Sequence, residues 1–199
     1  ELDIAVMVPI AGDVRVFGTS VVEVLHPPPG RPYQWSGSEL NDTSIVLRVD
    51  DEGRRMLATG DIEEAAQADL LARYGASLRS DVLTVPHHGA ATSDPEFLTT
   101  VAPELALIGV GVDNRYGHPH PATLKTLTAV GARIRRTDLE GTIRVRVPHT
   151  GQRSADAVAA AVRPTKVRCW LDVWGTGRNR SGERSPPRPS REGQACSSF

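Results

Sequence analysis

Short apolar runs recur along the chain, and each ends at a glycine, a proline or a polar side chain. Runs of this length are typical of buried β-strands when turn-forming residues bound them. Three of the runs lead into side chains that can carry chemistry, namely 56–59 into Asp61, 81–85 into His87 and His88, and 105–110 into the loop with His118. We therefore expect three strand ends to bring one carboxylate and several imidazoles to the same edge of a sheet, as in metal and phosphate sites.

The other segments alternate between strand and helix patterns. Further strands are expected at 3–10, 14–26 with a turn at 18–20, 44–49, 54–59, 132–137 and 141–147, and helices at 62–74, 94–101 and 121–130. Residues 50–53 form the expected hairpin turn. Asp61 is placed to cap the first helix, with Glu64 completing a capping box. From residue 44 onward the order ββαβαβαββ predicts an α/β fold in which helices flank a mixed sheet.

At 199 residues the chain is long enough for one domain with a full core and a tail. We assign residues 1–149 to the domain and residues 150–199 to a basic, Arg/Ser/Pro-rich tail that we expect to be largely disordered. No apolar run reaches the roughly 18 residues of a membrane-spanning helix. The chain opens on Glu1 without a signal peptide, which we interpret as a piece of a longer protein. Cys169 and Cys196 lie in the tail and either form a disulfide or, as we expect, stay unpaired.

Charge is divided unevenly between these two parts. Residues 1–147 carry 14 Lys and Arg against 20 Asp and Glu, whereas residues 148–199 carry 9 against 4. The acidic body gives no electrostatic reason for tight, sequence-independent binding of nucleic acid. If the domain acts on a polyanion, we expect bound cations to mediate the contact.

The residue types at the expected sheet edge are suited to metal-assisted hydrolysis. Carboxylate and imidazole together favour Zn, Mn or Fe over Ca or Mg alone. Such metals lower the pKa of a bound water and clamp a phosphoryl oxygen, while a nearby histidine moves the proton. In an extended segment His87 and His88 would point to opposite sides, so we expect one to reach metal or substrate and the other to support it.

Several of these residues have a second interpretation. Asp61 is either a ligand or simply the cap of the following helix. His26, which precedes three prolines, is either a loop residue or a ligand. We expect His120, between two prolines, to mark the entry of a helix, and we assign no role to His149. His118 is the stronger candidate because its Gly and Pro neighbours impose a defined turn.

The order of these segments resembles the distal half of the metallo-β-lactamase-like domain of the ComEC family of DNA-uptake competence proteins. The resemblance covers roughly residues 8–147. It rests on collinear motifs at 24–28, 41–47, 57–61, 81–89, 110–119, 136–138 and 141–143.

The resemblance implies an αββα sandwich, of which this chain would hold a part, with a dinuclear Zn or Mn centre. By position, Asp61 matches the bridging aspartate, His87 or His88 a late ligand or phosphate-binding residue, and His26 a mid-domain ligand. His118 lies in the family's final loop. We therefore assign metal binding to Asp61, His87 and His26, and catalysis to His88 and His118.

The family's position in the cell is also implied. Its domain is appended to a membrane channel that imports single-stranded DNA, lies outside the bacterial cytoplasmic membrane and degrades the strand that is not imported. The expected partners are therefore single-stranded DNA, the channel domain of the same parent protein and the missing N-terminal half of the sandwich. In this chain itself we expect no transmembrane segment, because no apolar run is long enough.

One feature of the family pattern is missing, because no HxHxDH segment occurs in this sequence. A dinuclear centre would thus be incompletely coordinated, and one face of the sheet would expose apolar surface. Our leading hypothesis is a partial metal-dependent nuclease or phosphodiesterase domain from a DNA-uptake protein. The alternatives are a catalytically silent interaction module of the uptake channel and a small-molecule phosphodiesterase of the same fold.

Overall fold

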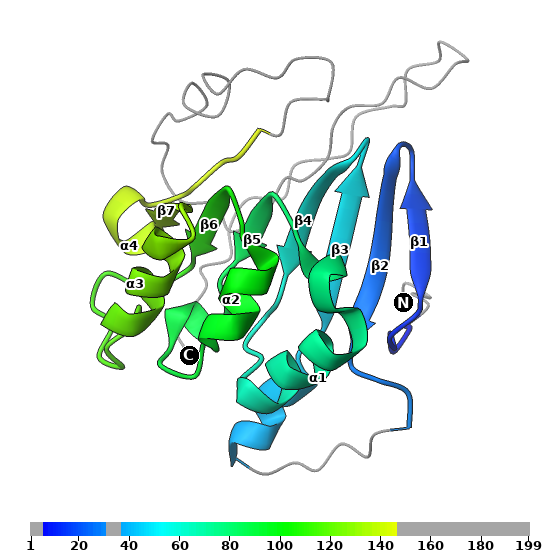
Figure 1. The fold of residues 1–199 in the computed structure, drawn as a ribbon, viewed down its shortest axis with the longest axis horizontal. Coiled ribbons are helices and arrows are strands. Elements are labelled where there is room, and N and C mark those ends of the chain that lie inside the picture. Colours follow the sequence, from blue (N-terminus) through cyan, green and yellow to red (C-terminus); the bar gives the residue numbers. More distant parts are fainter. Residues whose placement is uncertain (1–5, 31–36, 147–199) are drawn as a thin grey trace, which may run out of the picture.

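The computed structural model of the protein describes residues 6–30 and 37–146. They form a seven-stranded sheet whose strands follow one another in chain order (Figure 1). The strands are β1 (Val14–Phe17), β2 (Ser20–His26), β3 (Val46–Asp51), β4 (Arg54–Ala58), β5 (Val82–Thr84), β6 (Leu105–Ile108) and β7 (Arg133–Arg136). Pairing is antiparallel from β1 to β4 and parallel from β4 to β7. The expected α/β fold with a mixed sheet is confirmed.

The helices connect the parallel strands and lie together on one face of the sheet (Figure 1). They are α1 (Glu64–Tyr74), α2 (Pro95–Val101) and α3 (Pro121–Ala129), with the single turn α4 (Thr137–Glu140) after β7. Three 3-10 segments complete the description, namely η1 (Gly37–Thr43), η2 (Gly75–Leu78) and η3 (Pro86–Gly89). None of the described helices is long and apolar enough to cross a membrane.

The core lies between the parallel strands and the helices. Leu57, Leu83 and Ala106 are register partners on neighbouring strands and are fully buried. Alternation along a strand puts such partners on one face, where they meet Leu70 of α1 and Phe97 of α2 in the same cluster. Burial of these apolar side chains fixes the register of the strands, and their parallel direction places the ends of β4, β5, β6 and β7 side by side.

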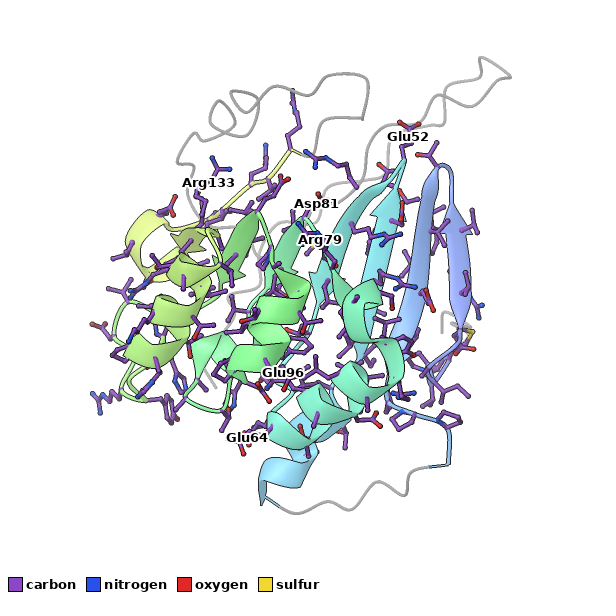
Figure 2. The ribbon with its side chains drawn as sticks, viewed as in Figure 1. Glu52, Glu64, Arg79, Asp81, Glu96 and Arg133 are labelled. Atoms are coloured by element: carbon purple, nitrogen blue, oxygen red, sulfur yellow. The ribbon has the colours of Figure 1, made fainter. Side chains whose placement is uncertain are left out.

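Figure 2 shows Asp81, which precedes β5, at one end of the strands, and Glu64 and Glu96, which lie in the first turns of α1 and α2, at the opposite end. Asp81 links β5 to the start of β4, because its carboxylate accepts hydrogen bonds from Arg54 Nη1 at 2.8 Å and from the Arg55 amide at 2.7 Å. The chain leaves the parallel strands at the other edge, where the helices begin. In open α/β sheets this edge is the usual position of a ligand site.

The start of α1 differs from the sequence-based expectation. The helix begins at Glu64 after the N-cap residue Glu63, so Asp61 is not its cap and no capping box forms. The amides of Glu63 and Ala66 instead donate to Asp42 Oδ1, at 2.7 and 3.3 Å. Because a carboxylate brought in from η1 satisfies the first turn, Asp61 is left outside the helix.

The two ends of the described chain also depart from expectation. Residues 6–10 contain no strand, and residues 1–5 lie outside the described part. The strand expected at 141–147 is wrong over residues 141–146, which form no strand. Thr137 turns the chain into α4, since its hydroxyl donates to the Val110 carbonyl at 2.7 Å and accepts from the Val110 amide at 2.7 Å. The tail at 150–199, with both cysteines, and His149 lie outside the described residues.

Candidate functional site

Three loops that follow β4, β5 and β6 meet at the edge where these parallel strands end. Thr59 joins the first two loops, because its hydroxyl donates to the Thr84 carbonyl at 2.7 Å and its amide to Thr84 Oγ1 at 3.0 Å. The His87 amide adds a hydrogen bond to the Gly60 carbonyl at 3.1 Å. The structure thereby brings His87, His88 and His118 to one edge, as the strand ends predict.

The expected extended geometry of residues 87–88 is wrong. His87, His88 and Gly89 all have positive φ values, of 44°, 57° and 78°, and form a tight turn in η3. Because the backbone turns left-handed at both histidines, their side chains do not alternate across a strand, and both line the same pocket. Gly89 is required here, since a Cβ at this position would lie 2.8 Å from Cβ of Pro119.

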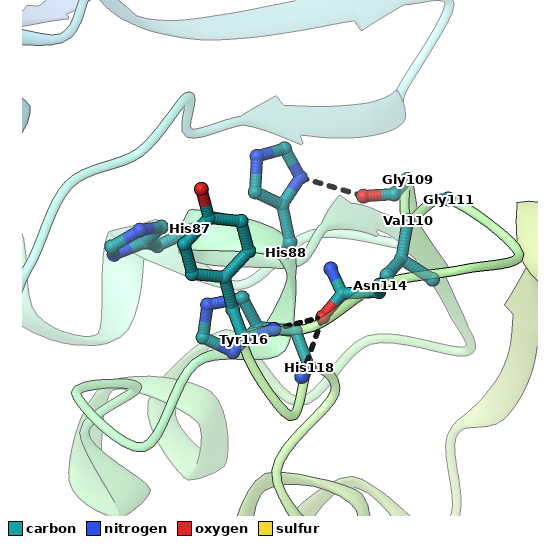
Figure 3. A pocket seen from close by; sticks show the side chains of 8 residues that line it. All are labelled: His87, His88, Gly109, Val110, Gly111, Asn114, Tyr116 and His118. Carbon is teal, nitrogen blue, oxygen red and sulfur yellow. Dashed lines mark hydrogen bonds between the residues drawn. The ribbon is translucent and has the colours of Figure 1, made fainter.

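The pocket at this edge is open and has a volume of about 540 Å³ (Figure 3). Its walls come from η3 and from the loop after β6. The lining residues are His87, His88, Gly109, Val110, Gly111, Asn114, Tyr116 and His118. The ring centroids of the three histidines are 5.4–6.5 Å apart. The pocket therefore offers several imidazole nitrogens to one small polar ligand.

Oxygen atoms of the protein lie beside the imidazoles of His88 and His87. His88 Nδ1 lies 2.6 Å from the Gly109 carbonyl oxygen, which can only accept, so Nδ1 carries a proton. His88 Nε2 lies 3.6 Å from Oδ1 of Asp61. His87 Nδ1 lies 3.0 Å from Oε1 of Glu63. His88 thus has one nitrogen hydrogen-bonded to the backbone, whereas His87 Nδ1 lies beside the Glu63 carboxylate without forming a hydrogen bond.

Sequence reasoning missed Glu63, which is the carboxylate beside His87. Its Oε1 also accepts a hydrogen bond from Asn41 Nδ2 at 2.8 Å, so the carboxylate is held in place from η1. The available signal was its position two residues after Asp61, in the same strand-end loop. A carboxylate that orients a histidine from outside the site is a common arrangement in catalytic and metal-binding sites.

His118 is held by the loop after β6. Asn114 Oδ1 accepts from the amides of Tyr116 at 2.9 Å and of His118 at 3.3 Å (Figure 3). Partial burial lowers the pKa of the His118 imidazole below its ordinary value, and the nearby histidines, His87 first, lower it further against an opposing effect of Asp61. The lowered pKa favours the neutral ring, which accepts a proton more readily than it donates one.

His26 lies at the end of β2 and does not line the pocket. Its side chain is fully buried, and its Nε2 lies 2.7 Å from the Asp42 carbonyl oxygen. Its Nδ1 is 3.7 Å from Oδ2 of Asp69 on α1. In this position His26 supports η1 and α1, and it reaches the pocket only through the contacts that η1 makes with Glu63. His120 is the N-cap of α3, as expected.

The donors at this edge do not by themselves make a Zn or Mn site. Within residues 6–30 and 37–146, no three His, Cys, Asp or Glu side chains stand close enough together to hold a metal ion. Asp61 and His88 approach each other, but a stable protein site needs three or four ligands. The described residues therefore do not fit a bound metal without further donors.

Comparison with known proteins finds no matching family model. The chain is 39% identical over 114 residues to Competence protein ComA of Neisseria gonorrhoeae, across 57% of this chain and 16% of the relative. It is 36% identical over 107 residues to ComE operon protein 3 of Bacillus subtilis (strain 168), across 53% and 14%. A third homologue, Recombination protein 2 of Haemophilus influenzae, is 32% identical over 130 residues, across 58% and 16%. The match thus spans only 14–16% of the length of these curated relatives.

Proposed function

We propose that this chain is part of a ComEC-type protein that takes up DNA, and that its histidine pocket binds and helps to hydrolyse a phosphodiester. The observation that carries the proposal is the convergence of His87, His88 and His118 on one open pocket at the ends of parallel strands. One relative is named a competence protein and another a ComE operon protein, which supports a role in DNA uptake.

The residues of the pocket divide the chemistry between them. His88 has its Nδ1 proton bound to Gly109, so its Nε2 is directed by a fixed ring. When protonated, this ring would donate to a phosphate oxygen and oppose the charge that develops there. Neutral His118 would take the proton of the attacking water, because a general base must be unprotonated at the working pH. Glu63, beside His87 Nδ1, would orient the His87 ring so that its Nε2 is left for a ligand in the pocket.

We propose a divalent metal at this site only if residues beyond the described ones supply further ligands. Zn or Mn would supply an activated water and a positive charge near the phosphate. Asp61 and His87 are the proposed ligands at this edge, whereas His26 would have to leave its buried contact with Asp42 to join them.

The cellular setting is proposed on the same grounds. We infer that the chain belongs with a membrane channel domain of one parent protein and lies outside the bacterial cytoplasmic membrane. Single-stranded DNA would be the substrate, and a further half of the sandwich would cover the open face of the sheet. The chain matches only 14–16% of the length of these relatives, which leaves room for further domains in such a parent protein.

Cleavage of a single-stranded oligonucleotide, labelled at one end, tests the proposal. With Mn²⁺ or Zn²⁺ present we expect His118→Asn and His88→Asn to lower the rate about 10²- to 10⁴-fold, the usual contribution of a proton-transferring group. His120→Ser is the matched control, because serine also caps α3 and the His120 side chain does not line the pocket. Equal rates in all three variants, or no cleavage by the unaltered chain, would contradict the hydrolytic role.

A second candidate function is a catalytically silent interaction module of the uptake channel. It is favoured by the lack of a three-ligand metal group among the described residues. Elemental analysis of the purified chain beside Asp61→Ala separates the two candidates. Stoichiometric Zn or Mn that is lost in the variant supports the enzyme, and metal-free protein that still binds its channel domain supports the module.

A third candidate function is a small-molecule phosphodiesterase. The acidic charge of residues 1–147 favours it, since a small substrate needs no long basic surface. Hydrolysis of a small chromogenic phosphodiester, without cleavage of the oligonucleotide, would favour that activity.

A further inference from the structure

Tyr116 stands at the mouth of the histidine pocket with 85% of its surface exposed. We propose that its ring is a stacking platform for an unpaired nucleobase of a single-stranded nucleic acid, next to a phosphate held by the histidines. This proposal deepens the proposed function and rests on it for the choice of a nucleic-acid ligand. It adds a binding residue that does no chemistry.

The ring of Tyr116 continues a series of aromatic rings that begins inside the pocket (Figure 3). Its plane is 16° from that of His118, with centroids 6.1 Å apart. His118 is in turn 29° from His88, with centroids 6.5 Å apart. A base that lies flat on Tyr116 would therefore be nearly parallel to the His118 ring, and we expect its phosphate to reach the histidines.

The platform is held in place before any ligand arrives. Asn114 Oδ1 accepts from the Tyr116 amide, and the Asn114 amide donates to the Gly111 carbonyl at 3.2 Å. The start of the loop is tied to Thr137 through the Val110 amide. Because the backbone is already ordered, stacking on the ring loses little conformational entropy.

The charges of the loop at residues 109–118 indicate that the nucleobase, and not the phosphate backbone of the nucleic acid, makes the main contact. Between residues 109 and 118 the chain has one cation, Arg115, and one carboxylate, Asp113, and both are exposed. Asp61 adds a further negative charge beside His88. Binding that depended on phosphate charge alone would need a basic surface, which this loop lacks. Stacking needs only an accessible base, so it selects single strands over duplex DNA.

Fluorescence anisotropy with a labelled oligothymidylate, in EDTA so that no strand is cleaved, tests the proposal. We expect Tyr116→Ala to weaken binding about 5- to 150-fold, which is the range for one stacked base. Tyr116→Phe should keep the affinity, because the ring and not the hydroxyl makes the contact. Val112→Ala is the matched control, since Val112 is an exposed apolar residue of the same loop.

Two further measurements separate stacking from charge attraction. An abasic strand of equal length should bind the unaltered chain as weakly as the base-bearing strand binds Tyr116→Ala. The logarithm of the binding constant should fall with the logarithm of salt concentration with a slope of only about −0.7, because a single phosphate is contacted.

The experiments distinguish an error in the Tyr116 stacking proposal from an error in the proposed hydrolytic role. Unchanged affinity of Tyr116→Ala, equal binding of abasic and base-bearing strands, or no measurable binding would overturn the platform. Normal stacking by a chain that never cleaves DNA would support the platform and contradict hydrolysis alone. Circular dichroism of each variant verifies that the fold is retained.

Discussion

At the scale of single residues, His118 gives the most direct prediction. Its pKa should lie below the ordinary value of 6.5, because partial burial and the neighbouring histidines both disfavour the charged ring. Histidine NMR titration of the unaltered chain and of His118→Asn, which assigns the signal, measures this value. His88→Asn should raise the pKa of His118 by removing one cationic neighbour. A His118 pKa at or above 6.5 would contradict the prediction.

The same shift has a consequence for stability. Because the folded pKa is lower than the unfolded one, the unfolded chain binds more protons as the pH falls through 6.5. The contribution of His118 therefore favours folding above that pH and is lost between 6.5 and the lower folded pKa. In urea titrations, His118→Asn should lose less stability on acidification than the unaltered chain does.

The candidate site could be predicted in part from the sequence. The strand ends placed His87, His88 and His118 together correctly, because parallel strands necessarily end at one edge. Glu63 was missed although it lies two residues after Asp61, and Tyr116 could not be predicted, since the positions of both side chains depend on loop conformation. The left-handed turn at residues 87–89 is likewise fixed by contacts with the distant Pro119 and Gly60, and no local pattern encodes them.

At the scale of secondary structure, Asp42 should be the main cap of α1 although it belongs to η1. Asp42→Ala should lower the free energy of unfolding by about 1 kcal/mol, within the usual range of about 0.5–2 kcal/mol for a lost cap. Asp42→Asn is the matched variant and should retain most of the stability, because its amide oxygen still accepts from Glu63 and Ala66. Urea midpoints compare the three proteins, and an Asp42→Ala midpoint equal to that of the unaltered chain would refute this assignment.

The two caps show why some helix starts are predictable and others are not. Asp94 caps α2 through the amides of Glu96 and Phe97, two and three residues ahead, and the sequence predicts this start correctly. The cap of α1 comes from 21 residues away, so a local rule assigned it wrongly to Asp61. The strand expected at 141–147 is wrong over residues 141–146 for the same reason, since contacts of Thr137 with Val110 redirect the chain.

At the scale of the whole molecule, the fold is a sheet with its three longer helices on one face (Figure 1). The alternation of strands and helices was sufficient to predict this class, because each apolar run needs a helix to cover it. The sequence also led us to expect exposed apolar surface on the sheet. Among the described residues, many exposed large apolar side chains precede residue 22, on the segment before β1, on β1 and at the start of β2, namely Val6, Met7, Val8, Ile10, Val14, Val16, Phe17 and Val21.

Strand β1 is an edge strand that pairs only with β2 in the described sheet, and Val16 near its centre is 66% exposed. An apolar edge strand is a template for pairing with another chain. We therefore expect the isolated chain to self-associate as its concentration rises, in sedimentation velocity experiments. Val16→Lys should reduce this association, because a charge on the edge opposes pairing and burial of the strand.

Val112→Lys provides the control for this last prediction. Val112 is even more exposed than Val16 but lies on the loop beside the histidine pocket, away from the edge strand. It adds the same charge to the molecule, so a general effect of net charge would change both variants alike. Association lost only in Val16→Lys would locate the contact at β1. If the unaltered chain sediments as a monomer at every concentration, or if both lysine variants behave the same, β1 is not the contact surface.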